Sequence, residues 1–396
     1  MSTVDGTQPT PLGVAVVGFG WMARAHTQAY LRVLHHFPEL GVRPRLVSAV
    51  DDVPGRAEAA ARQFGFASAG TDWHAVLDDP RAQAVSITAP NWLHREIAVA
   101  MAGAGKHIWL EKPAGLGLED TAAIAEAVRA NGVQSNIGFN YRNAPAVVAA
   151  REMVRNGSIG RVTHARFQFF SDYAAHPEGA LTWRYQLERG GRGVVGDLGS
   201  HAVDLVRFVL GEVGAVMADT AIFVPERAVP TGPTEGHARV AGGAMGPVEN
   251  EDYLGCLLRM RDGARVVLEA CRVSVGEQNN YGFQVHGTEG ALYWDFRRMG
   301  ELGTSLGKSF QDQPLSTVYV GPGAGEYGAF QPGSGIAMSY DDLKVVECHN
   351  FLRSVAEGRP HGATIEDALR AAEVLEAALT SADNGTWAPV AQVGPA

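Results

Sequence analysis

The first third of the chain alternates short apolar runs with segments of helical periodicity. Continuous apolar runs predict strands buried on both faces of a parallel sheet, and the periodic segments between them predict helices that cover it. Strands are expected at 13–17, 45–50, 84–88, 107–110 and 134–139. Helices are expected at 21–36, 54–64, 94–104, 118–131 and 145–155, and two more at 341–357 and 364–382.

The pattern changes after about residue 142. Long β-rich stretches follow, interrupted by turns at 261–264 and 287–290, and they predict an antiparallel meander. These stretches are 161–173, 215–224, 253–275 and 281–296. Two segments rich in Gly and Pro, 226–250 and 300–335, are expected to be long loops that form either a lid or an interface.

Composition excludes several classes of function. The chain has 396 residues, of which 46% are hydrophobic and 19% charged, as expected for two domains with cores of their own. A net charge of −10 argues against a nucleic-acid partner. The N-terminus lacks a secretory pattern, and no apolar run is long enough to span a membrane, so we expect a cytoplasmic protein without a membrane partner.

No metal site is expected. The three cysteines form no Cys-x-x-Cys pair, which indicates buried thiols and neither a disulfide framework nor a zinc site. His26, His35, His36 and His349 have no carboxylate or thiolate at ligand spacing and are expected to be structural.

A glycine-rich turn follows the first predicted strand and precedes a helix. It reads Gly18-Phe19-Gly20-Trp21-Met22-Ala23, the Gly-x-Gly-x-x-Ala pattern of dinucleotide binding. Gly18 permits the tight turn, Gly20 lets the backbone approach a pyrophosphate, and free N–H groups at the helix start hold its charge. The alternative is a glycine-rich turn in another kind of α/β protein.

An acidic residue ends the second predicted strand. A carboxylate at Asp51 would accept hydrogen bonds from the adenosine ribose and repel a 2′-phosphate, so NAD is favoured over NADP. In the alternative interpretation, Asp51 and Asp52 only cap the following helix. We therefore expect an α/β Rossmann dinucleotide-binding domain at 1–141, with a flexible tail at 1–11. An α+β domain at 142–396 would carry an open-faced, mostly antiparallel sheet.

Two further segments carry candidate chemistry. The strand at 107–110 ends in Glu111-Lys112-Pro113, and the carboxyl ends of strands in an open α/β sheet face the ligand crevice. Asp197 and His201 are four residues apart and share one face of a helix start. Taken singly, Lys112 would be a solvated lysine, Asp197 a helix cap and His201 a structural histidine.

Together these motifs resemble the Gfo/Idh/MocA oxidoreductases. The resemblance runs from about Val14 to Trp387, with Arg192 as a departure where relatives often keep a small residue. Its motifs are Gly18-x-Gly20-x-x-Ala23, Ala89-Pro90-Asn91-x-x-His94, Glu111-Lys112-Pro113 and Gly196-Asp197-x-Gly199-x-His201-x-x-Asp204. Asn140-Tyr141-Arg142, Thr182-Trp183-Arg184 and Tyr340-Asp341-Asp342-Leu343-Lys344 resemble a branch that holds levoglucosan and inositol dehydrogenases.

The resemblance implies hydride transfer between a nicotinamide and a secondary alcohol of a small neutral carbohydrate or cyclitol. It implies three catalytic residues, Lys112, Asp197 and His201. His201 would be the general base, because an imidazole ordinarily titrates near 6.5, and Lys112 would stabilise the developing alkoxide. Asp197 would orient His201 or bind a neighbouring hydroxyl.

The remaining site residues are expected around these three. The cofactor would contact Gly18, Phe19, Gly20, Trp21, Met22, Asp51, Ala89, Pro90, Asn91, His94, Glu111, Lys112, Asn140, Trp183 and Arg184. The substrate would contact Lys112, Tyr141, Arg142, Tyr173, His176, Asp197 and His201.

Two other functions remain open at this stage. An NAD-dependent glycosidase or lyase would use transient oxidation and regenerate its cofactor, and a non-catalytic sugar or nucleotide sensor would bind without turnover. The C-terminal sheet has no evident second covering layer, and such a face predicts a homodimer or homotetramer formed through it.

Overall fold

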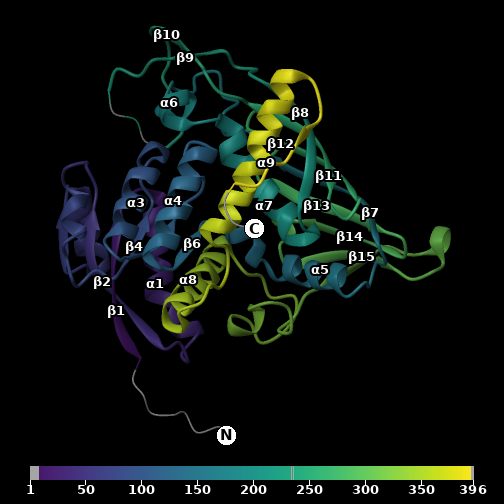
Figure 1. Ribbon diagram of the computed structural model, residues 1–396, viewed down its shortest axis with the longest axis horizontal. Coiled ribbons are helices and arrows are strands. Elements are labelled where there is room, and N and C mark those ends of the chain that lie inside the picture. The colour runs from purple at the N-terminus through teal and green to yellow at the C-terminus, as the bar shows by residue number, and fades with distance from the viewer. Residues whose placement is uncertain (1–8, 233, 235, 394–396) are drawn as a thin grey trace, which may run out of the picture. The chain divides into compact units, whose positions relative to one another are not determined.

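The computed structural model describes residues 9–232, 234 and 236–393, which form two compact units (Figure 1). Unit 1 comprises the chain up to Ala114, with 123–140 and 339–366. Unit 2 comprises 115–122, 141–338 and the chain from Asp367 onward. The division therefore differs from a single boundary at residue 141, because a segment near the C-terminus folds with the first unit. Of the expected tail at 1–11, residues 1–8 lie outside the described residues, whereas Thr10 and Pro11 belong to the first strand.

Unit 1 contains the parallel sheet that the apolar runs predict. Among the described residues it has six strands, in the order β3-β2-β1-β4-β5-β6. In β1, Val14–Val17 are wholly buried because β2 and β4 flank them. The strands are β1 (Thr10–Val17), β2 (Val42–Val50), β3 (Ser68–Gly70), β4 (Ala84–Ile87), β5 (His107–Leu110) and β6 (Ser135–Ile137). The sequence pattern did not predict β3, a three-residue edge strand.

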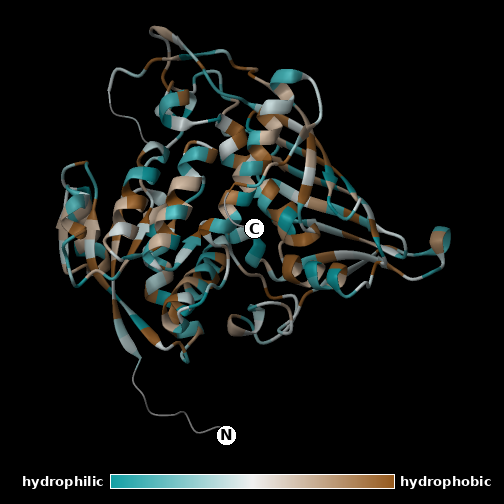
Figure 2. Ribbon diagram, in the orientation of Figure 1, coloured by the Kyte–Doolittle hydropathy of each residue, from teal (hydrophilic) through white to brown (hydrophobic). Residues whose placement is uncertain are grey.

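Amphipathic helices accompany this sheet, and their alternating apolar and polar positions are visible in Figure 2. They are α1 (Trp21–His36), α2 (Arg56–Phe64), α3 (His94–Gly103), α4 (Leu118–Asn131) and α8 (Tyr340–Glu357), with short 3-10 turns η1 (Trp73–Val76), η2 (Asn91–Leu93) and η3 (Asn140–Asn143). Helix α8 packs against α1. It begins with a capping box in which Ser339 and Asp342 satisfy each other's backbone N–H groups.

Unit 2 contains a larger, mostly antiparallel sheet. Among the described residues its order is β16-β15-β14-β13-β7-β12-β11-β8-β17. Only β7 and β12 pair in parallel among these strands, so the expected mostly antiparallel sheet is confirmed. The strands are β7 (Val162–Phe170), β8 (Val213–Ala221), β11 (Tyr253–Met260), β12 (Arg265–Cys271), β13 (Asn280–Gly287), β14 (Gly290–Asp295), β15 (Glu301–Leu306), β16 (Ser316–Tyr319) and β17 (Ala388–Pro389).

The two segments expected to be loops contain strands. Segment 226–250 holds the hairpin of β9 (Glu226–Ala228) and β10 (Met245–Pro247), and segment 300–335 holds β15 and β16. The sequence did not predict these strands because their segments are rich in Gly and Pro, which are rare in strands. They form because each pairs with a neighbouring strand, which can outweigh residue propensity.

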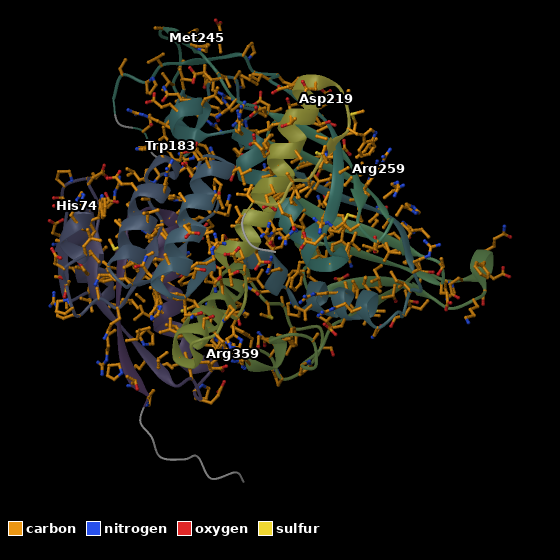
Figure 3. The ribbon with its side chains drawn as sticks, viewed as in Figure 1. His74, Trp183, Asp219, Met245, Arg259 and Arg359 are labelled. Atoms are coloured by element: carbon orange, nitrogen blue, oxygen red, sulfur yellow. The ribbon has the colours of Figure 1, made fainter. Side chains whose placement is uncertain are left out.

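Helices α5 (Pro145–Arg155) and α7 (Ser200–Leu210) pack on one face of this sheet. Its opposite face is mixed in character and not simply apolar. That face exposes Leu257, whose neighbours on the flanking strands are Val267 and Met217. Arg166 on β7 and Gln284 on β13 are exposed farther across the same face. Arg259 on β11 and Asp219 on β8 are labelled in Figure 3. Unit 2 also holds α6 (Leu187–Gly190), η4 (Trp183–Tyr185), the π-helical turn η5 (Val195–Gly199), η6 (Phe296–Arg298), η7 (Phe310–Asp312) and η8 (Tyr327–Ala329). Helix α9 (Ile365–Asn384) follows α8. Searching the described helices for a segment suited to crossing a bilayer finds none.

Candidate active site

The glycine-rich turn joins β1 to α1 in unit 1. Gly18 has φ +85°, and a Cβ there would meet Ala89 Cα at 2.5 Å, so only glycine fits. A Cβ on Gly20 would instead meet open space, and no side chain caps the N-terminus of α1. An open backbone beside uncapped helical N–H groups suits a dinucleotide pyrophosphate. Trp21, 66% exposed, stacks on Tyr340, and Met22 accepts a hydrogen bond from the Tyr340 hydroxyl.

Asp51 ties this turn to the end of β2. Its carboxylate accepts the Phe19 N–H at 2.5 Å and the Val53 N–H at 3.0 Å, while the Phe19 ring packs in the core. The Arg56 guanidinium lies 3.2 Å from the same carboxylate. The N-cap of α2 is Gly55, so Asp51 does not cap that helix. The carboxylate therefore shapes the glycine turn and holds a guanidinium beside it.

His94 links the loops that follow β4 and β5. It is buried, and its ring nitrogens lie 2.7 Å from the Pro113 carbonyl oxygen and 2.8 Å from that of Ala89. The structure thus engages both nitrogens with backbone, where the sequence predicted an edge of the nicotinamide ribose. Pro90 precedes and Asn91 begins η2, which leads into the same helix.

Glu111 lies in a buried network of charges rather than at an exposed strand end. Its carboxylate is 2.5 Å from Lys344 Nζ and 3.0 Å from His26 Nε2. Lys344 Nζ also donates to Glu347 at 3.0 Å, and Trp109 Nε1 donates to the same Glu347 oxygen at 2.5 Å. A single ammonium is therefore bonded to two buried carboxyl groups. We refer to His26, Trp109, Glu111, Lys344 and Glu347 as the buried charge network.

This network corrects one expectation, because His26 has a carboxylate partner in space. The ligand atoms of His26, Glu111 and Glu347 lie within 4.8 Å of one another, but the Lys344 ammonium is bonded to both carboxylates and supplies the positive charge there. The signal available in the sequence was the Lys344-x-x-Glu347 spacing among apolar residues of α8.

Lys112 is the residue that follows Glu111 of the buried charge network along the chain. It is partly exposed, and its N–H donates to Glu111 Oε2 at 3.2 Å. The Lys112–Pro113 peptide bond is cis. The backbone that carries Lys112 is thus fixed by the carboxylate that Lys344 holds. Asn140, another expected cofactor residue, is wholly buried in unit 1 just after β6.

In unit 2, Asp197 lies on η5 and His201 on the first turn of α7, in one continuous helical segment. The Tyr173 hydroxyl donates to Asp197 Oδ2 at 2.6 Å. Burial, and then the Asp197 carboxylate, raise the pKa of Tyr173 well above its ordinary value, so Tyr173 stays a donor. The His201 ring packs edge-on against Tyr141 at 4.8 Å, and its carbonyl accepts the Tyr281 hydroxyl at 2.6 Å. Asp197 and His201 are thus oriented by aromatic neighbours.

Arg142 differs from its expected role as a substrate ligand. It is buried and forms an ion pair with Asp204, and it lies 3.3 Å from a carboxylate oxygen of Asp367. Its positive charge is therefore matched within unit 2. Tyr141 beside it belongs to an aromatic cluster with Phe169, Tyr281, Phe296 and His201.

Two of the remaining expected residues line a cavity in unit 2, and two lie on η4. Tyr173 and His176 line the cavity. Trp183, labelled in Figure 3, and Arg184 lie on η4. The Arg184 guanidinium stacks over the Trp183 ring at 4.4 Å. Arg184 also donates to the Gly236 carbonyl at 3.4 Å.

Two family models match the chain. Residues 12–139 match the oxidoreductase family with an NAD-binding Rossmann fold, and residues 147–293 match the GFO/IDH/MocA C-terminal domain. These ranges coincide with the parallel sheet and with most of the second sheet.

Individual relatives agree with the family models. Levoglucosan dehydrogenase of Pseudarthrobacter phenanthrenivorans is 35% identical over 96% of this chain and 99% of its own length. The scyllo-inositol 2-dehydrogenase (NAD(+)) of Bacillus subtilis is 29% identical over 63% of this chain and 66% of its own length. A solved structure of levoglucosan dehydrogenase in complex with NADH has a TM-score of 0.91 at 32% identity and covers 97% of this chain and 100% of that one. The chain therefore belongs to the Gfo/Idh/MocA oxidoreductases, with an NAD-binding Rossmann domain followed by the family's C-terminal domain.

Proposed function

We propose that this enzyme oxidises a secondary hydroxyl of a neutral sugar, anhydrosugar or cyclitol with NAD, or catalyses the reverse reduction. The observation that carries the proposal is the helical segment with Asp197 and His201 on successive turns and the Tyr173 hydroxyl bonded to Asp197. The names of the relatives, levoglucosan and inositol dehydrogenases, support this substrate class.

NAD, when bound, supplies the acceptor for the hydride. In unit 1 the turn Gly18–Met22 would hold the pyrophosphate through backbone N–H groups, and Asp51 would accept hydrogen bonds from the adenosine ribose. Ala89, Pro90 and Asn91 follow β4, and Asn140 follows β6 of the same sheet. Trp183 and Arg184 are further proposed contacts from unit 2.

The chain's own residues would handle the proton and the charge. A sugar hydroxyl is a very weak acid, so its hydride leaves only as the O–H proton is removed. His201 would take that proton as general base, and the Lys112 ammonium would stabilise the alkoxide oxygen. Asp197, held by Tyr173, would accept a hydrogen bond from an adjacent substrate hydroxyl and so orient the ring.

The test follows NADH absorbance over a panel of myo-inositol, scyllo-inositol, levoglucosan, glucose, glucosides and xylose. Lys112→Ala and His201→Ala should each lower kcat by about 10²-fold or more on the best substrate. NAD affinity should change much less, because neither residue needs to contact the adenosine or pyrophosphate. His201→Ala should also abolish a rise of kcat/KM with pH.

Matched controls are available at exposed positions. Lys308→Ala and His74→Ala remove the same side chains where they are 79% and 59% exposed (His74, Figure 3), and should leave kcat unchanged. A variant of Lys112 or His201 that keeps wild-type kcat would remove that residue from the proposal. Product formation with no net NADH would instead identify a glycosidase or lyase that regenerates its cofactor, and binding without turnover would identify a sensor.

A further inference from the structure

A cavity of 540 Å³ lies within unit 2, between the segment after β7 and the segment around β9 and β10. Its size falls within the range of about 300–1,000 Å³ that is typical of small-molecule pockets. Residues 172–182 form one side, and His237, Ala238 and Arg239 form another. None of the proposed catalytic residues, Lys112, Asp197 and His201, is among the residues that line it.

Backbone hydrogen bonds join the two sides of this cavity. The Ala180 N–H donates to the Ala238 carbonyl at 2.9 Å, and the Val240 N–H donates to the Glu178 carbonyl at 2.8 Å. The Leu181 N–H donates to the Ala228 carbonyl at 2.8 Å. These hydrogen bonds attach the segment 226–250, which was expected to be a loop, to the side of the cavity formed by residues 172–182. This pairing indicates a cavity that is already formed before a ligand binds.

Tightly packed side chains form the floor of the cavity. Tyr185 lines it and is buried between two guanidinium groups, with Arg227 at 4.2 Å and Arg272 at 4.8 Å from its ring centroid. Arg227 is itself 1% exposed and donates to the Ala174 carbonyl, and a Cβ on Gly179 would meet its Nη1 at 2.3 Å. The wall therefore has little freedom to collapse into the space.

The lining combines aromatic rings with varied hydrogen-bonding groups. Tyr173 and His237 contact each other with ring centroids 4.6 Å apart. Asp172, His176, Arg239 and Gln278 supply a carboxylate, an imidazole, a guanidinium and an amide. Aromatic faces are electron-rich and attract the polarised C–H groups of a sugar ring, while the polar groups can serve its hydroxyls. This mixture suits a neutral polyhydroxylated ring, because the Asp172 carboxylate and the Arg239 guanidinium balance each other's charge in the lining.

Tyr173 connects the cavity to the proposed reaction site. Its ring lines the cavity, and its hydroxyl donates to Asp197. Asp197 itself does not line the cavity, so a ligand that fills the cavity and also reaches Asp197 extends along the Tyr173 side chain. We propose that this cavity binds the second sugar ring of a glycoside, so that the preferred substrate is a disaccharide or a larger glycoside oxidised on one ring. This inference rests on the function proposed above.

The test compares methyl α- and β-glucosides with α- and β-linked glucose disaccharides in the intact enzyme with NAD. We expect at least one disaccharide to have a kcat/KM about tenfold or more above that of its methyl glycoside. Ala238→Trp, which fills the cavity, should lower kcat/KM for that disaccharide at least tenfold and leave the methyl glycoside within about threefold. Ala241→Trp places the same side chain on the same segment at an exposed position outside the lining, and should change neither.

The outcomes separate the two proposals. Equal loss on both substrates with Ala238→Trp, or no loss on the disaccharide, would overturn the cavity assignment. Faster turnover of a glucuronide or sugar phosphate than of any neutral disaccharide would also overturn it in favour of an anionic ligand. If no sugar of any length yields NADH, the proposed function itself fails. His237→Ala provides a second variant, which removes one aromatic wall without adding bulk and should also selectively reduce disaccharide turnover.

Discussion

Asp51 shows how one side chain that shapes the fold can also be the residue proposed to select the cofactor. It accepts the N–H of Phe19 inside the glycine turn and also pairs with Arg56. The pattern of a strand followed by an acidic residue predicted its position, whereas the Arg56 contact depends on how the chain turns through Gly55 into α2. The Asp51 carboxylate thus pairs with the Arg56 guanidinium, which without this partner would attract a 2′-phosphate.

Asp51→Ala should therefore do more than weaken NAD binding. Without the carboxylate, Arg56 loses its partner and can pair with the 2′-phosphate of NADP, so the preference for NAD should shrink by about tenfold or more, equivalent to about 1.4 kcal/mol. Side-by-side titrations of NAD and NADP measure this change. Asp51→Ala combined with Arg56→Ala should lose the gain in NADP binding. A wild-type preference for NADP would refute the role assigned to Asp51.

At the scale of elements, the buried charge network connects α8 to β5. Lys344 and Glu347 come from a helix more than 200 residues beyond Glu111, and together they place two carboxylates around one ammonium. Burial, and then the Glu111 carboxylate, raise the pKa of Glu347 from 4.5 to about 7. A carboxyl whose pKa is raised by folding stabilises the protein when protonated, and that contribution is lost as the pH rises through 7.

Glu347→Gln should remove this pH dependence, because an amide does not titrate between pH 5 and 8. The glutamine oxygen can still accept hydrogen bonds from Trp109 and Lys344. The free energy of unfolding of the variant, minus that of the wild type, should rise between pH 5 and 8 by about 1–3 kcal/mol. Burial also lowers the pKa of His26 to about 4, but that contribution is common to both proteins in the comparison. Melting temperatures across this pH range measure the difference.

The matched control is Glu58→Gln on the exposed side of α2, which should show a constant difference from wild type. A difference for Glu347→Gln that stays flat with pH would mean that Glu347 keeps its charge throughout.

At the scale of the whole molecule, the outer face of the unit 2 sheet remains the proposed surface for a homodimer or homotetramer. Exposed Leu257 lies between Val267 and Met217 of the neighbouring strands, and polar Arg166 and Gln284 are exposed farther across the same face. Such a face resembles ordinary subunit interfaces, which mix apolar and polar groups. The sequence had suggested a more uniformly apolar face.

Leu257→Glu should shift the protein towards monomer in light scattering at micromolar concentration, because it buries a carboxylate in the contact. Leu315→Glu makes the same change at a residue that is 64% exposed just before β16, and should leave the mass unchanged. A wild-type monomer under these conditions would contradict assembly altogether.

The sequence by itself determined the parallel sheet, the glycine turn and the family. These features are local: apolar runs, helical spacing and glycines at fixed offsets act over a few residues. Helices α1 and α5 were predicted to the residue for the same reason. The four-residue spacing of Asp197 and His201 also predicted that both lie on one helical segment.

Tertiary structure decided what depends on distant partners. Strands β15 and β16 form by pairing at a sheet edge, despite unfavourable composition. Helix α8 belongs to unit 1, where it packs against α1 and where Lys344 pairs with Glu111. Arg142 is structural because it pairs with Asp204 and Asp367. The cavity exists because the 226–250 segment pairs with 178–181. Burial and charge pairing act through space, so the partners that give each side chain its role appear only in the folded chain.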